Sequence, residues 1–136
     1  MGLTGQLLGL MAMETARALA GDTAITCHFP PNETDRAPTI AFQVTPAPSL
    51  RDLPNLQRVT IRMNGKVRMA GTLRQSRQSG LEALVLKGRS ERNFLYAVGM
   101  HHSGTAVLTI KAPVDLPPTS RHGRCTGQEQ GWTSSQ

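Results

Sequence analysis

The sequence is poor in aromatic side chains, and none of its hydrophobic runs is long enough to cross a membrane. It contains one Trp, one Tyr and three Phe among 136 residues. Small barrels that bind single-stranded nucleic acid stack the bases on exposed aromatic side chains. Here Phe29 and Phe42 lie in patterns typical of a core, and Phe94 and Tyr96 share one face of a strand bounded by apolar residues. We therefore expect no specific binding of nucleic acid.

Motifs for catalysis and for cofactor binding are also missing. The sequence has no GxSxG motif, no glycine-rich phosphate loop and no pair of carboxylates suited to acid–base chemistry. His101 and His102 are neighbours in MHHSG, but no carboxylate lies near them in the sequence, so we interpret them as turn residues. We expect a protein that is not an enzyme and that binds no cofactor and no metal.

The N-terminal residues are similar to a secretory signal peptide. Leu3 to Met13 form an apolar run of the right length, and Ala18-Leu19-Ala20 fits the small-x-small cleavage pattern. Cleavage after Ala20 would remove one Arg and one Glu, so the net charge would stay at +6. No Lys or Arg precedes the apolar run, and the alternative is that residues 1–20 form a short amphipathic helix packed on the domain.

Only two cysteines are present, Cys27 and Cys125, one near each end of the remaining chain. In a small exported domain this arrangement predicts one disulfide and a periplasmic or secreted location. The alternative is a Cys₂His₂ zinc site that adds His28 and His122. Adjacent residues on a strand point to opposite faces, so Cys27 and His28 could not bind one metal without a bulge, which favours the disulfide.

Hydrophobic residues after Asp22 recur mostly with a period of two, in short segments separated by turn residues. We expect strands at residues 23–29, 39–45, 57–62, 66–74, 81–87, 93–98, 105–112 and 121–126. These strands would form a single all-β domain over residues 21–126, followed by a disordered tail over 127–136. A disulfide between the first and last strands requires them to be close, so we predict an antiparallel meander closed as a small barrel or a tightly folded sandwich.

The segment RVTIRMNGKVRMAG, residues 58–71, predicts a β-hairpin. A two-residue turn at Asn64-Gly65 would place charged and apolar side chains on the same face. A three-residue loop, Met63-Asn64-Gly65, instead pairs Arg62 with Lys66 and Ile61 with Val67, so that one face is apolar. We therefore predict the three-residue loop, and the opposite face then carries Arg58, Arg62, Lys66 and Arg68.

These four cations support two interpretations. One is a solvated strand face on which salt screens the charges. The other is an anion-binding strip, which further cations near the next turns could extend, namely Arg74, Arg77, Lys87, Arg89 and Arg92. Because the net charge of +6 favours anionic partners, we expect a soluble binding module for an anionic envelope component or a protein. The sequence does not indicate an oligomeric state.

The segments ITCHF, YAVGMHHSGTAVLTI and HGRCTG resemble small exported β domains of bacteria, in which an early Cys and a late Gly-x-Cys enclose a meander. The outline is also similar to that of the periplasmic c-type lysozyme inhibitors, which carry a Ser-x-Ser-Gly-x-x-Tyr loop. The nearest stretch here runs from Ser76 to Ala83, with one extra residue between the serines and Ala83 in place of the Tyr. This resemblance implies an alternative function, lysozyme inhibition, with Ser79 and Gly80 in the inhibitory loop.

Overall fold

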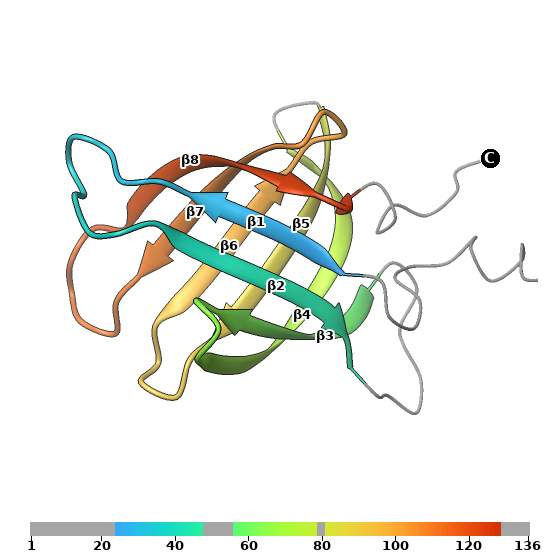
Figure 1. Ribbon diagram of the computed structural model, residues 1–136. Helices are drawn as coiled ribbons and strands as arrows, with labels where there is room; N and C mark the ends of the chain where they lie inside the picture. The colour runs from blue at the N-terminus through green and yellow to red at the C-terminus, as the bar shows by residue number, and fades with distance from the viewer. Residues whose placement is uncertain (1–23, 48–55, 79–80, 129–136) are drawn as a thin grey trace, which may run out of the picture.

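The computed structural model is an all-β closed barrel of eight antiparallel strands (Figure 1). It describes residues 24–47, 56–78 and 81–128. Each strand pairs with the next in sequence, and the first also pairs with the last. The strands are β1 (Ile25–Phe29), β2 (Ile40–Pro46), β3 (Leu56–Met63), β4 (Val67–Gln78), β5 (Leu81–Arg89), β6 (Leu95–Met100), β7 (Thr105–Lys111) and β8 (Thr119–Thr126).

The predicted all-β fold is confirmed, as a barrel and not as a sandwich. The expected signal peptide, residues 1–20, lies outside the described residues, as do residues 129–136 of the expected tail. Gln128 is described, and its buried side chain donates a hydrogen bond from Nε2 to the carbonyl oxygen of His102, at 3.0 Å.

The core follows from the period-two pattern, because alternate side chains of each strand point into the barrel. In β1, for example, Ile25, Cys27 and Phe29 are buried. The ring of Phe42 lies between those of Phe29 and Tyr96, with edge-to-face centroid distances of 6.0 and 5.9 Å. Burial of each large apolar side chain stabilises the fold by about 1.5–3 kcal/mol.

Cys27 and Cys125 lie directly opposite each other on β1 and β8 and form the predicted disulfide. The bond joins residues 98 positions apart in the chain, and both side chains are buried. It uses both sulfur atoms and so excludes the alternative zinc site. A disulfide-bonded β domain is consistent with a periplasmic or extracellular location.

The register of the β3–β4 hairpin differs from the predicted one. Arg62 lies opposite Arg68, not Lys66, and Ile61 lies opposite Met69, not Val67. The loop between the paired residues is 64–66, one position later than expected. The predicted division into an apolar and a basic face still holds, because each partner on β4 moves by two residues and therefore stays on the same face.

Asn64 explains this register. Asn64 and Gly65 both have positive φ angles, 51° and 71°, and the N–H of Lys66 donates to the carbonyl oxygen of Met63 at 3.0 Å. These values indicate a type I′ turn, which leaves Lys66 as an extra, unpaired residue in the loop. Asn64 also bonds to Ala41, because its N–H donates to the Ala41 carbonyl and its Oδ1 accepts from the Ala41 N–H, both at 2.8 Å.

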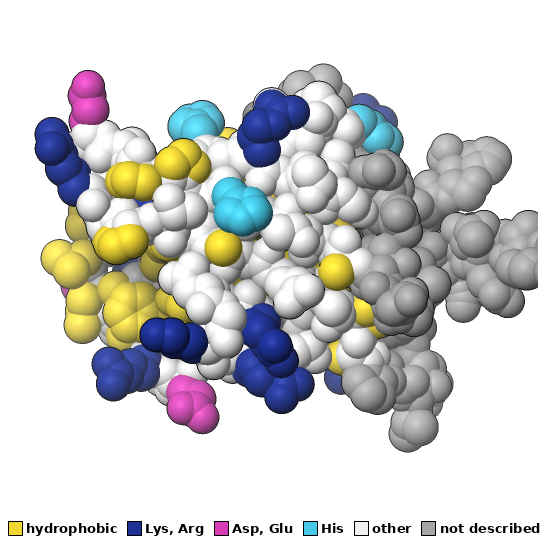
Figure 2. Space-filling view, viewed as in Figure 1, with side chains coloured by type: hydrophobic (Ala, Val, Ile, Leu, Met, Phe, Trp, Pro, Cys, Tyr) yellow, Lys and Arg dark blue, Asp and Glu magenta, His cyan; other side chains and the backbone are white. Residues whose placement is uncertain are grey.

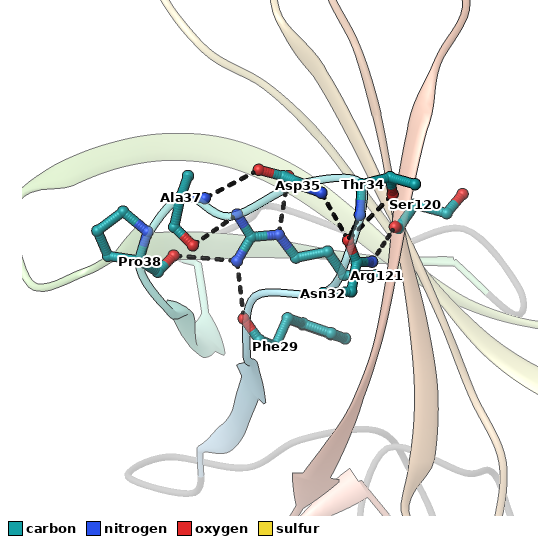
Figure 3. A network of polar contacts seen from close by, with 8 residues as sticks. All are labelled: Phe29, Asn32, Thr34, Asp35, Ala37, Pro38, Ser120 and Arg121. Atoms are coloured by element: carbon teal, nitrogen blue, oxygen red, sulfur yellow. Dashed lines mark hydrogen bonds and ion pairs between the residues drawn. The ribbon is translucent and has the colours of Figure 1, made fainter.

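Arg121 of β8 holds the connection between β1 and β2, although only 1% of its side chain is exposed (Figure 3). Its Nε donates to Oδ2 of Asp35 at 2.9 Å. Its two terminal nitrogens donate to backbone carbonyl oxygens at 3.0–3.1 Å, those of Phe29, Ala37 and Pro38. The buried charge is therefore both paired and hydrogen-bonded, as a buried guanidinium requires.

Asp35 accepts the hydrogen bond from Arg121 Nε as a carboxylate. The hydrogen bond from Arg121 lowers the pKa of Asp35 below its usual value of 3.8, and a second bond from the Ala37 N–H lowers it further. Asn32 secures the same connection, since its Oδ1 accepts from the N–H groups of Thr34 and Asp35 at 3.0 and 2.7 Å. The connection is thus a fixed part of the barrel.

Candidate anion-binding face

The outer face of β3, β4 and β5 carries most of the cations that the sequence analysis singled out. Val59 and Ile61 of β3 point into the barrel, so the residues between them point outward. The same alternation in β4 and β5 places Met69, Leu73 and Leu86 inside. The outward cations are exposed, and we call them the basic face: Arg58, Arg62, Arg68, Arg74, Lys87 and Arg89.

Strand pairing makes this face continuous. Arg62 lies opposite Arg68, and Thr72 is flanked by Arg58 on β3 and by Lys87 on β5. From Arg68 to Arg74 the face extends roughly 20 Å along β4, given a rise of about 3.3 Å per residue. Figure 2 shows several Lys and Arg side chains, and one acidic side chain, along the lower edge of the molecule, where β3, β4 and the turn between β5 and β6 lie in Figure 1.

No carboxylate interrupts the basic face within the described strands. The other outward positions of β3, β4 and β5 whose side chains the structure describes carry apolar or hydroxyl groups, namely Leu56, Thr60, Ala70, Thr72, Ser76, Ala83 and Val85. Two ion pairs join described residues, Arg77–Glu82 at 3.5 Å and Arg121–Asp35 at 2.9 Å, and neither involves this face. On these described strands, therefore, no acidic side chain shares the face with Arg62, Arg68, Arg74, Lys87 or Arg89.

The structure changes the membership of the predicted strip. Arg58, Arg62 and Arg68 share the face as expected, whereas Lys66 lies in the loop at its end. Arg74, Lys87 and Arg89 join the face, but Arg77 pairs with Glu82, and Arg92 lies in the turn between β5 and β6. The sequence alone could not decide this, because which cations of β5 lie beside those of β4 depends on the register, which pairs Thr72 with Lys87.

A small open hollow lies in the same outer surface. Its volume is about 110 Å³, and Leu56, Thr72, Arg74, Ser76, Val85 and Lys87 line it. All six residues occupy outward positions on β3, β4 or β5. The hollow therefore brings two cations and two hydroxyl groups of the basic face together with two apolar side chains.

The other sequence candidates give no comparable site. His101 is half-buried and His102 is exposed in the turn between β6 and β7, and the described residues contain no group of three metal-ligating side chains. Ser79 and Gly80, the residues of the lysozyme-inhibitor alternative, lie outside the described residues. In the part of the chain that the structure describes, no helix is long and apolar enough to cross a membrane.

Comparisons with protein-family models, with curated proteins and with solved structures found no match to this chain. The resemblances to exported β domains and to lysozyme inhibitors therefore stay predictions. Any function has to be argued from the chemistry of the barrel surface.

Proposed function

We propose that this protein is an exported, non-catalytic binding module whose basic face binds a linear anionic polymer of the cell envelope, such as an acidic glycan. The observation that carries the proposal is the set of six cations on one outer face of three neighbouring strands, with no carboxylate among the outward positions of those strands. The buried disulfide supports the exported location.

The arrangement of charge favours a ligand over a merely solvated surface. Like charges directly opposite each other on a sheet destabilise the fold, as Arg62 and Arg68 do here. An anion bound between them would convert this repulsion into attraction to both guanidinium groups. Arg also forms bidentate hydrogen bonds with sulfate, phosphate and carboxylate groups, which makes a row of arginines well suited to a polyanion.

The shape of the face points to an extended ligand. A strip roughly 20 Å long can contact several charged groups of one chain in succession. The outward positions of β3, β4 and β5 hold no aromatic side chain on which a nucleic-acid base could stack. Binding should therefore be dominated by charge and should weaken as salt increases.

The test is the affinity for heparin, a linear sulfated glycan, measured by isothermal titration with the full chain. We expect binding that weakens by about tenfold or more between about 50 mM and about 200 mM NaCl. The double variant Arg62→Glu/Arg68→Glu should lose most of this affinity.

The matched control is Arg36→Glu/Arg124→Glu, which makes the same change in net charge at exposed positions on the β1–β2 connection and on β8, away from the basic face. We expect the control to retain most of the affinity. Equal losses in the two double variants would show that only net charge matters, and the proposed binding face would then be wrong.

A further inference from the structure

The hollow beside Thr72 has the properties of a site for one discrete anionic group. Its volume of about 110 Å³ is well above the 10–15 Å³ that a single water needs on the same measure. It can therefore accept a polyatomic group. Its lining comes from three neighbouring strands of a closed barrel, and Thr72 and Arg74 at its centre are paired with strands on both sides.

The polar groups around the hollow are able to donate hydrogen bonds, and two of them are cationic. Thr72 lies directly opposite Lys87, and Arg74 is the next outward residue of β4. Arg74 and Lys87 are therefore diagonal neighbours, with Cα atoms about 7–8 Å apart. Ser76 follows Arg74 at the next outward position. A group held between the two cations would also be within reach of the Thr72 hydroxyl, whereas the Cα of Ser76 lies about 13 Å from that of Thr72 along β4.

The remaining lining is apolar. Val85 is only 9% exposed although it occupies an outward position, and Leu56 is half-buried. Arg74 lies opposite both residues, Leu56 on β3 and Val85 on β5. An apolar floor lowers the local dielectric and so strengthens charge-assisted hydrogen bonds above it. It also offers contact to the carbon atoms that carry an anionic ester.

From these features we infer that the hollow binds a tetrahedral oxyanion, a phosphate or sulfate ester group, in preference to a carboxylate. A tetrahedral oxyanion presents oxygen atoms in several directions and can accept hydrogen bonds from Arg74, Lys87 and Thr72 at once. A carboxylate has two oxygens whose lone pairs lie in one plane, so it fits donors that converge from several directions less well. The inference rests on the proposed function and names the chemical group that the face selects.

The experiment uses the full chain labelled with ¹⁵N and titrated with inorganic phosphate, sulfate or acetate at constant ionic strength. We expect saturable shifts of the amide signals of Thr72, Ser76 and Val85 with phosphate or sulfate, and affinity for acetate at least about fivefold weaker. Whichever of the two oxyanions binds more tightly identifies the ester. Acetate binding as tight as that of both oxyanions would overturn the inference.

Thr72→Val removes the hydroxyl and leaves the shape and the net charge unchanged. It should weaken oxyanion binding by about fivefold to tenfold. The control is Thr60→Val, at another outward threonine outside the hollow, and it should leave the affinity unchanged. In the same way Lys87→Gln should weaken oxyanion binding more than Arg89→Gln, which removes a charge two residues away on the same strand.

Failure of this inference can be told apart from failure of the proposed function. If Thr72→Val binds phosphate and sulfate as tightly as the unaltered protein while heparin binding still depends on Arg62 and Arg68, the hollow is not a site and the basic face stands. If heparin binding does not depend on Arg62 and Arg68 but the hollow retains its saturable oxyanion response, the extended-polymer proposal fails alone.

Discussion

Arg62 and Arg68 lie directly opposite each other on the outer face of β3 and β4. Both side chains are exposed, so water and salt reduce their repulsion without removing it. Each arginine points outward because the next residue on its strand is buried in the core. Ile61 is the buried neighbour of Arg62, and Met69 is that of Arg68. The register that buries the core therefore also brings the two arginines together. Their repulsion lowers the stability of the free protein, and the same two charges would attract an anionic ligand.

Charge reversal at this pair should stabilise the free protein while weakening binding. Arg68→Glu replaces a repulsive cross-strand pair with an attractive one and should raise the free energy of unfolding by about 0.5–1 kcal/mol. Urea denaturation at low salt measures this gain, which should shrink in about 1 M NaCl because the Debye length falls to about 3 Å. The same variant should bind heparin less tightly. A variant that loses both stability and binding would show that Arg68 has a packing role instead.

The strands of this barrel were predictable because the alternation of buried and exposed residues can be read within each short segment of the sequence. Residues such as Val59 and Ile61 alternate with polar neighbours, and that alternation fixes both the strand and its buried face. The β3–β4 register was not predictable in the same way. It includes Lys66 as an extra loop residue after the Asn64-Gly65 turn, and Asn64 is also held by two hydrogen bonds to Ala41, 23 positions away, which no pattern within the hairpin reveals.

Arg121 shows a second limit of sequence reasoning about this protein. Arginine is mostly exposed in proteins, and nothing in the segment around Arg121 marks it as buried. Its burial is possible because Asp35 and three carbonyl oxygens lie within reach, between 83 and 92 positions away in the chain. The basic face was only partly predictable for a related reason, since Arg74 and Lys87 become neighbours through the pairing of β4 with β5.

The disulfide should make a large contribution to stability. A bridge between residues 98 positions apart stabilises a fold by about 4–5 kcal/mol on the chain-entropy model. The double variant Cys27→Ala/Cys125→Ala should therefore unfold at a much lower urea concentration than the unaltered protein. Because both sulfurs are buried, reductant alone should leave the bridge intact in the folded protein, and reduction should require denaturant. Fast reduction of the folded protein under native conditions would contradict this expectation.

Substitution of Arg121 should destabilise the barrel more than substitution of Arg124, another arginine of β8. Arg121→Met leaves the carbonyl oxygens of Phe29, Ala37 and Pro38 without their donor, at a cost of about 2–4 kcal/mol in the free energy of unfolding. Arg124→Met is the matched control, because Arg124 is exposed and its Nη2 donates to the Ser103 carbonyl at 3.1 Å. Urea denaturation of both variants measures the difference. Equal effects would show that the network around Arg121 adds little.

The Asp35–Arg121 pair should also make stability depend on pH. Because Arg121 holds the pKa of Asp35 below 3.8, the unfolded chain binds a proton at Asp35 more readily than the folded protein does. The contribution of Asp35 to stability is therefore fully present above pH 3.8 and is lost as the pH falls through the lower pKa of the folded state. Asp35→Asn should be less stable than the unaltered protein at neutral pH, and the difference should shrink in acid.

Thermal unfolding followed by circular dichroism between about pH 2 and pH 7 measures this dependence, since acid unfolding follows the protonation of paired carboxylates. Asp115→Asn changes an exposed acid in the connection between β7 and β8 and serves as the control. The control should retain the acid sensitivity that Asp35→Asn loses. If Asp35→Asn and the unaltered protein lose stability in parallel as the pH falls, Asp35 is not the group that couples protonation to folding.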